Sequence, residues 1–258
     1  MDLIDKKIIV TGCASGMGAA TVRAYVAAGT SVVGMDIADD AGRAVCAEAT
    51  ASGPGDATYV SVDVADQLSV DVAFEEANTH LGSLDAMAHP AAIAAPSNAG
   101  DVSVADWDQM FAVNVRGTML TNQAAYQRLK VSGGGAIINF GSISGRRPEP
   151  GAAAYSAAKG AVHAWTRTAA GTWGADNVRV NAVLPAISTP MAQTALAMAT
   201  EEELVEMHWR NMQSIALGQE YGDPDRDLGP VMVFLASDAS RFITGQLIPV
   251  DGGQSNVG

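Results

Sequence analysis

The sequence predicts an α/β protein built on a doubly wound parallel sheet. Short β-rich runs alternate with longer, alanine-rich segments of helical pattern along the chain, and this alternation is typical of parallel βαβ units. A glycine-rich turn over residues 11–18 joins the first strand to the first helix, which is where such sheets hold phosphate groups. The 258 residues, 48% of them hydrophobic and 17% charged, suffice for a full core.

Seven strands are expected, each from a short run rich in β-branched and other apolar residues. They cover residues 7–10, 31–36, 58–63, 84–88, 136–141, 178–183 and 246–250. Helical patterns follow the first three strands as far as residues 28, 50 and 81, and others cover residues 104–130, 153–172 and 228–235. Because no interior linker or low-complexity stretch interrupts this order, we expect a single domain over residues 1–258.

The segment from about residue 190 to 223 breaks this rhythm. It has a helical pattern, is rich in methionine and precedes a helix without an intervening strand. Insertions after the carboxyl end of a strand are where such sheets place lids over ligands. We therefore expect a small helical lid over an apolar substrate pocket, although some of the methionines are equally expected in a helix core.

The composition excludes several classes of partner. A net charge of −13 with four lysines argues against nucleic acid and against an anionic membrane surface. No apolar run is long enough to span a bilayer, and the first residues lead into a strand rather than a signal peptide, so a cytoplasmic protein is expected. The two cysteines, Cys13 and Cys46, lack metal-site spacing, and we expect no metal site.

Tyr155 and Lys159 predict a proton-transfer site. They lie four residues apart in a stretch of helical pattern, so they share one face. A neighbouring ammonium group favours the phenolate and lowers the pKa of a tyrosine, whose ordinary value is about 10. Ser142 follows the strand expected at residues 136–141 and offers a hydroxyl that can hold a substrate oxygen against the phenol. This set suits proton exchange with an alcohol or a carbonyl.

The same spacing occurs a second time, at Tyr126 and Lys130. Ser142 stands thirteen residues before Tyr155, whereas the residue thirteen before Tyr126 is Val113, which has no hydroxyl. Lys130 also runs into a glycine-rich helix stop. We therefore expect the second pair to be an exposed helix end.

The glycine-rich turn and two aspartates predict a dinucleotide site. The turn has the spacing G-x-x-x-G-x-G. Its glycines let the backbone approach a pyrophosphate at the positive end of a helix, although alone it could be a purely structural turn. Asp36 ends the second strand, where a carboxylate accepts from an adenosine ribose and repels a 2′-phosphate; the alternative is that it caps the next turn. Because Ser15 and Ile37 beside it are neutral, NAD is favoured over NADP. Asp63 ends the third strand, placed to meet an adenine amino group.

Together these features resemble the short-chain dehydrogenase/reductase family from the first strand to the last. The motifs that agree in order and spacing are residues 11–18, Asp63 with Val64, residues 114–117, Ser142, Tyr155 with Lys159, Pro185 and residues 245–253. Because independent motifs agree in order, the resemblance is specific. It implies a Rossmann fold, a nicotinamide cofactor and a homotetramer built on the long helices and the last strand.

The resemblance also implies a role for each matching residue. Tyr155 would be the general acid/base, Lys159 would lower its pKa and hold the nicotinamide ribose, and Ser142 would position the carbonyl oxygen. Asn114 would bend its helix and hold a water that extends a proton relay from Lys159. The expected cofactor-binding residues are Gly12, Ser15, Gly16, Met17, Gly18, Asp36, Ile37, Asp63, Val64, Ala91, Tyr155, Lys159, Pro185, Ile187 and Thr189, of which the last two would meet the nicotinamide carboxamide.

Two stretches depart from the family pattern. The usual Asn-Asn-Ala-Gly after the fourth strand is replaced by residues 89–92, His-Pro-Ala-Ala. Pro90 removes a backbone donor and Ala92 narrows the approach to the cofactor, so we expect an altered cofactor wall that still binds. No other histidine or cysteine stands at ligand spacing from His89, which favours a structural histidine over a base or a metal ligand. Residues 185–190 replace the usual Pro-Gly and are one residue short, so this loop is expected to follow a different path.

The sequence therefore predicts an NAD-dependent oxidoreductase that interconverts a hydrophobic secondary alcohol and its ketone. One alternative is a 3-oxoacyl-thioester reductase, against which Asp36 and the few basic residues available to dock an acidic carrier both count. Another alternative is a catalytically silent nucleotide-binding protein. Its only support is the altered stretch at residues 89–92, because Ser142, Tyr155 and Lys159 are all present.

Overall fold

Seven parallel strands form the centre of the computed structural model, which describes residues 3–190, 212 and 214–255. The strands are β1 (Lys7–Thr11), β2 (Ser31–Asp36), β3 (Asp56–Ser61), β4 (Ala86–His89), β5 (Gly135–Phe140), β6 (Val178–Pro185) and β7 (Leu247–Val250). Their order in the sheet is β3-β2-β1-β4-β5-β6-β7. The order reverses between β1 and β4, and in such sheets ligands bind at this switch point, beyond the carboxyl ends of the strands. The predicted doubly wound Rossmann fold is confirmed.

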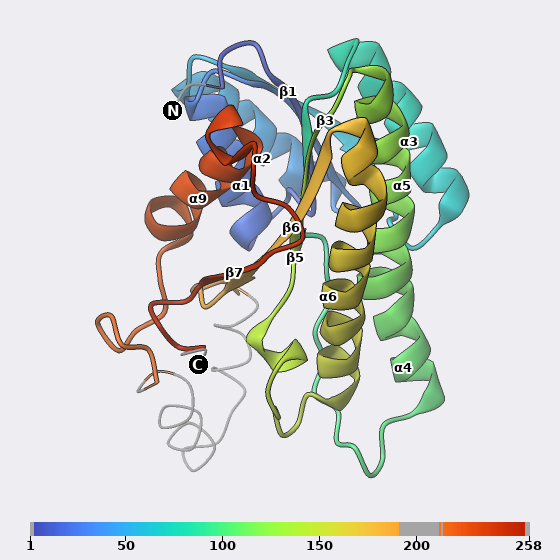
Figure 1. Ribbon diagram of the computed structural model, residues 1–258, viewed down its shortest axis with the longest axis vertical. Coiled ribbons are helices and arrows are strands. Elements are labelled where there is room, and N and C mark those ends of the chain that lie inside the picture. The colour runs from blue at the N-terminus through green and yellow to red at the C-terminus, as the bar shows by residue number, and fades with distance from the viewer. Residues whose placement is uncertain (1–2, 191–211, 213, 256–258) are drawn as a thin grey trace.

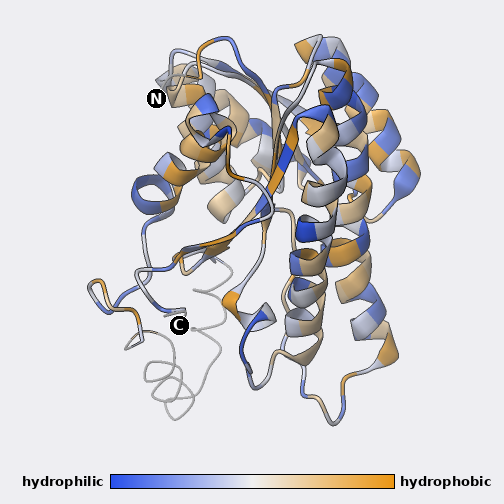
Figure 2. Cartoon of the chain, viewed as in Figure 1, coloured by the Kyte–Doolittle hydropathy of each residue, from blue (hydrophilic) through white to orange (hydrophobic). Residues whose placement is uncertain are grey.

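Helices cover both faces of the sheet (Figure 1). On one face lie α1 (Gly16–Ala27), α2 (Asp39–Ser52) and α9 (Gly229–Ala236); on the other lie α3 (Gln67–Leu81), α5 (Gly117–Val131) and α6 (Ala153–Trp173). The shorter α4 (Val104–Phe111) leads into α5. Along these helices apolar and polar positions alternate in patches (Figure 2), as expected for elements with one buried face.

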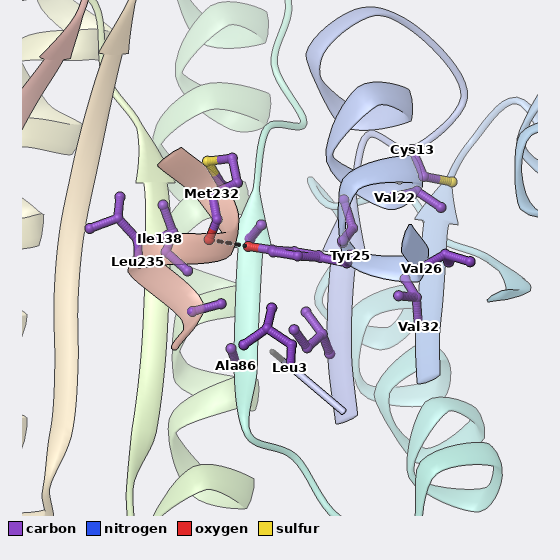
Figure 3. Packing of buried hydrophobic residues seen from close by; sticks show 14 of the residues in the cluster. Leu3, Cys13, Val22, Tyr25, Val26, Val32, Ala86, Ile138, Met232 and Leu235 are labelled. Atoms are coloured by element: carbon purple, nitrogen blue, oxygen red, sulfur yellow. Dashed lines mark hydrogen bonds between the residues drawn. The ribbon is translucent and has the colours of Figure 1, made fainter. Parts of the chain in front are cut away.

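Each strand supplies both halves of the core. In β1, Ile8 and Val10 face the cluster with α1 and α9, and Ile9 faces the cluster with α3 and α5. This is the two-residue period of a strand buried on both sides. Tyr25 of α1 is fully buried, and its hydroxyl donates to the Met232 carbonyl of α9 at 3.4 Å, which ties two helices together (Figure 3).

Several expected elements have different boundaries, and the differences in two of them bear on the site. The third strand ends at Ser61 rather than at residue 63, because Asp63 starts a turn. Its carboxylate accepts from the Ala65 N–H at 2.9 Å, and its own N–H donates to the Ser69 hydroxyl at 2.9 Å. The helix expected at residues 104–130 contains a π-helical turn, η1 (Ala112–Arg116), between α4 and α5.

The lid predicted at about residues 190–223 falls largely on residues 191–211 and 213, outside the described residues, and it stays a prediction. The described chain on either side of residues 191–213 comes together. Gly222 pairs with Ile187, which follows β6, and the Ser188 N–H donates to the Gly222 carbonyl at 2.9 Å. Within the described residues, no helix is both long and apolar enough to cross a membrane.

Candidate active site

A cavity of about 580 Å³ lies beyond the carboxyl ends of β1, β2 and β4, at the switch point of the sheet. Most of the predicted cofactor-binding residues line it. They are Gly12, Ser15, Gly16, Met17, Gly18, Asp36, Ile37, Asp63, Val64, Ala91 and Thr189. The volume and the mixed apolar and polar walls suit a cofactor-sized ligand.

The turn between β1 and α1 is shaped by glycines. Gly12 and Gly16 have φ values of +61° and +53°, in the left-handed region that favours glycine. A Cβ at Gly12 would lie 2.7 Å from Ala91 backbone atoms, and a Cβ at Gly18 would lie 1.8 Å from the Gly12 carbonyl oxygen. Ser15, the N-cap of α1, makes no side-chain capping hydrogen bond, so it leaves the first-turn N–H groups to an anionic ligand. The turn therefore fits a dinucleotide pyrophosphate.

Asp36 is fixed at the end of β2. One carboxylate oxygen accepts from the Ala14 N–H at 2.9 Å and the other from the Ala38 N–H at 3.0 Å. The first bond reaches across to the glycine-rich turn and the second is local, and together they hold the carboxylate at the cavity wall. Ile37 beside it is 70% exposed and also lines the cavity, which leaves an apolar surface for an adenine ring.

Asn114 lies inside the π-helical turn, a geometry that is frequent at functional sites. Its side chain accepts from the Ile93 N–H and donates to the Ile93 carbonyl, both at 2.8 Å. This pairing fastens the segment after β4 to the long helix. The backbone carbonyl of Asn114 accepts from the Thr118 hydroxyl at 2.7 Å. The second lone pair of that oxygen could hold the water of the proton relay that the resemblance implies.

Tyr155, Lys159 and Ser142 come together at the carboxyl end of β5. α6 carries the first two on one face, and Ser142 is the residue that caps the short helix η2 (Ile143–Gly145) after β5. The Lys159 ammonium lies 5.5 Å from the centroid of the Tyr155 ring and donates to the Phe140 carbonyl at 2.8 Å. The Ser142 hydroxyl lies 3.1 Å from the hydroxyl of Ser144.

The pKa values of this set differ from the simplest expectation. Burial raises the pKa of Tyr155 above its ordinary 10, and the hydrogen bond with Ser142 opposes this increase. Burial also lowers the pKa of Lys159, to about 8. The Lys159 ammonium is bonded to the Phe140 carbonyl, and the lowering of the phenol pKa that the family resemblance implies stays a prediction. A charged ligand beside the pair would shift both groups.

His89, in the departing stretch, is a buried polar anchor. Its Nδ1 lies 2.8 Å from the Thr11 hydroxyl and 3.1 Å from that of Thr121. Burial, with a smaller effect from Lys159, lowers its pKa to about 3, so the ring is neutral. The contacts of Nδ1 favour a structural histidine, while the buried Nε2 has no hydrogen-bond partner within the described residues. Pro90 and Ala92 line the cavity as expected for an altered cofactor wall.

The second Tyr-x-x-x-Lys pair contacts groups other than those of the candidate site. The Tyr126 hydroxyl bonds to Asp176, Lys130 forms a salt bridge with the same carboxylate at 3.2 Å, and the tyrosine ring stacks on Trp173 at 4.5 Å. Tyr126 is therefore half-buried rather than exposed as expected. No pattern pointed to Asp176, which lies 50 positions from Tyr126 and meets the pair only in the fold.

Four predicted cofactor residues do not line the cavity: Tyr155, Lys159, Pro185 and Ile187. The side chain of Ile187 is 7% exposed and belongs to the apolar core. Other residues line the cavity without having been predicted, and they neighbour predicted ones or lie on the α4 side, where no motif marks them. They are Val62, Ala65, Ile93, Gln109, Ala112, Val113 and Pro190, whereas Pro90 and Ala92 were expected at the cofactor wall.

Comparisons with known proteins agree with this geometry. A family profile described as enoyl-(acyl carrier protein) reductase matches residues 12–255. The cis-4-hydroxycyclohexanecarboxylate dehydrogenase of Sinomonas cyclohexanicum is 34% identical, over 98% of each chain. The meso-2,3-butanediol dehydrogenase of Serratia marcescens is also 34% identical, over 96% of this chain and 94% of its own.

Among solved structures, a short-chain type dehydrogenase/reductase from Mycobacterium ulcerans superposes with a TM-score of 0.91. It shares 29% sequence identity, and the match covers 99% of this chain and 92% of that one. The similarity therefore spans the cavity, the β5–α6 region and the sheet together.

Proposed function

This chain belongs to the short-chain dehydrogenase/reductase family, and we propose that it is an NAD-dependent member with Tyr155 as general acid/base. Its enzyme class is that of the alcohol dehydrogenases and ketoreductases. The observation that carries the proposal is the meeting of Ser142, Tyr155 and Lys159 at the end of β5, beside a dinucleotide-sized cavity.

The proton half of the reaction belongs to the chain's own residues. Ser142 holds the substrate oxygen, and the phenol of Tyr155 accepts the hydroxyl proton when an alcohol is oxidised. Lys159 stabilises the phenolate once its ammonium is released from the Phe140 carbonyl. The nicotinamide, when bound, supplies the hydride acceptor or donor. Because burial raises the pKa of Tyr155, alcohol oxidation should become faster toward alkaline pH.

NAD is favoured over NADP by the adenosine end of the cavity. The Asp36 carboxylate is held there by two backbone N–H groups, and a 2′-phosphate would meet this negative charge. No arginine or lysine lines the cavity within the described residues. The same features count against a 3-oxoacyl-thioester reductase, for which NADPH is the usual reductant.

The substrate class is a secondary alcohol with an apolar body. The two named relatives act on secondary alcohols by their names. In this chain Tyr155 packs against an apolar cluster that includes Ile93, Met110 and Phe111, and these side chains would adjoin the reacting carbon. The cytoplasmic location and the homotetramer stay predictions.

Steady-state kinetics with a panel of cyclic and acyclic secondary alcohols and ketones, run with both coenzymes, tests the proposal. We expect turnover with NAD, and a ratio of kcat/KM that favours NADH over NADPH. Tyr155→Phe should reduce kcat by about 100-fold or more and leave NADH affinity unchanged. Tyr126→Phe is the matched control and should keep full activity.

Three results would redirect the proposal. Full activity of Tyr155→Phe removes the phenol from the mechanism. A preference for NADPH with thioester substrates would support the thioester reductase instead. Nucleotide binding without turnover of any compound in the panel would support a catalytically silent protein.

A further inference from the structure

His163 extends the stripe of functional side chains on α6. Tyr155, Lys159 and His163 follow one another at four-residue intervals, so they lie on one face of a single helix. His163 is 3% exposed, although histidine is a polar residue. A polar ring buried at this place needs hydrogen-bond partners.

The partners of this ring belong to the Ser142 loop. The Ser142 N–H lies 3.3 Å from His163 Nε2, and because a backbone N–H can only donate, Nε2 must accept. The Gly145 backbone raises the pKa of the ring, as a nearby carbonyl does. This assigns the ring proton to Nδ1.

The ring stays neutral in this position. Burial lowers the pKa of His163 to about 4, and the positive charges of Lys159, Arg167 and Arg146 add to the decrease. A protonated ring would have no lone pair at Nε2 to offer to Ser142. Burial and the charged groups around the ring therefore keep Nε2 unprotonated and able to accept a hydrogen bond at neutral pH.

Two glycines enclose the ring. A Cβ at Gly141 would lie 2.4 Å from Nε2, and a Cβ at Gly145 would lie 2.8 Å from Cε1. The glycines give the ring room, but they also give the loop that carries Ser142 a large conformational freedom. A rigid contact at both ends of the loop removes that freedom.

We infer that His163 is the positioning residue for Ser142, holding the Ser142 hydroxyl at a fixed place relative to Tyr155. The inference rests on the proposed function, because it assigns Ser142 a part in the reaction. Since α6 carries both His163 and Tyr155, the helix itself sets the separation of serine and phenol. Misplacing a catalytic group by about 1 Å can cost on the order of 100-fold in rate.

Kinetics of His163→Leu and His163→Gln test this assignment. Leucine fills the space without an acceptor, whereas the glutamine side-chain oxygen can reach the place of Nε2. We expect His163→Leu to lower kcat by roughly 10- to 100-fold with unchanged NADH affinity, and His163→Gln to recover most of the loss. His80→Leu, at a half-exposed histidine of α3, should behave as wild type.

Hydrogen–deuterium exchange supplies a readout that does not depend on activity. In His163→Leu, the amides of residues 142–146 should exchange faster, while those of β5 and of the rest of α6 stay protected. Unchanged exchange and unchanged kcat would overturn the assignment, as would a glutamine variant no better than leucine. If wild type turns over no substrate, the proposed function fails while the exchange comparison still decides the role of His163.

Discussion

The fold buries the ammonium group of Lys159, which is an unfavourable environment for a charge. Lys159 is 4% exposed, and its ammonium donates to the Phe140 carbonyl, with no carboxylate paired to it within the described part of the chain. Burial disfavours the charged form and lowers its pKa from 10.5 to about 8. Such a group destabilises the folded chain at neutral pH, which is a common property of residues retained for catalysis.

This buried charge predicts a pH-dependent stability difference between wild type and Lys159→Met. Because the folded pKa lies below the unfolded one, the unfolded chain binds more protons between about pH 8 and pH 10.5. Stability therefore rises with pH in this window. Relative to Lys159→Met, the free energy of unfolding of wild type should rise by about 2 kcal/mol from pH 7 to pH 10, measured by urea unfolding.

Lys130 provides the control for this comparison. Its pKa is raised by the Asp176 carboxylate, so its contribution to stability is fully present below the unfolded pKa and is lost only as pH rises through the higher folded one. Lys130→Met should show no comparable rise over the same range. If the free energy of unfolding of wild type minus that of Lys159→Met stays constant or falls as pH rises, the assignment of a buried ammonium with a lowered pKa is contradicted.

At the residue scale, the sequence predicted which side chains lie together better than it predicted the shifts of their pKa values. The spacing of Ser142, Tyr155 and Lys159 pointed to three side chains that the fold brings together, because helical periodicity and strand ends are local properties. The direction of the shift in the phenol pKa could not follow from spacing, since it depends on burial and on the hydrogen bond with Ser142. His163 was missed because its partners are a backbone N–H and two glycines, which leave no motif.

At the scale of elements, the turn from β1 to α1 depends on close contact between two glycines. Gly18 lies on α1 where a Cβ would come within 1.8 Å of the Gly12 carbonyl oxygen. The helix therefore packs directly on the turn that faces the cavity. Moving the helix outward by the width of a methyl group would also move the N–H groups intended for a pyrophosphate.

Gly18→Ala should consequently weaken both stability and cofactor binding. Overpacking at this contact is expected to cost roughly 1–3 kcal/mol, and NADH affinity, measured by fluorescence titration, should fall by about tenfold or more. Gly171→Ala is the matched control: a Cβ at Gly171, on the exposed side of α6, would meet no atom within 4 Å. That variant should bind NADH normally and gain up to about 1 kcal/mol. Equal behaviour of the two variants would contradict the close-contact interpretation.

The elements themselves were predictable where the pattern is local. All seven strands and the long helices follow from alternation of β-rich and alanine-rich runs. The end of β3 was misplaced by two residues, because the side-chain bond of Asp63 to the Ala65 N–H ends the strand and its effect is invisible in hydropathy. The π-helical turn at residues 112–116 does not show in hydropathy, since one inserted residue hardly changes a helical pattern; only the family resemblance implied a bend at Asn114.

At the scale of the whole molecule, two further apolar surfaces are present, the first of which shares Ala112 with the cavity. One is a hollow of about 610 Å³ on α4, α5 and α6, with Phe111, Met119 and Trp165 among its lining residues. The other adjoins β7, the edge strand of the sheet, where Phe242 is fully exposed. Exposed edges and apolar patches of this kind mark association sites, and two separate surfaces on one chain suit a tetramer with two kinds of interface.

The sequence predicted this assembly only through the family resemblance, because hydropathy cannot tell a helix face buried in the core from one buried by another subunit. The structure supplies residues with which to test it. A charge in either surface should remove one interface, so Met119→Arg and Phe242→Asp should each convert a tetramer into dimers, and the double variant should be monomeric. Size-exclusion chromatography with light scattering measures these masses directly. Val72→Asp, which places a charge at an exposed apolar position of α3, should stay tetrameric. A monomeric wild type, or single variants that remain tetramers, would show that these surfaces serve another purpose.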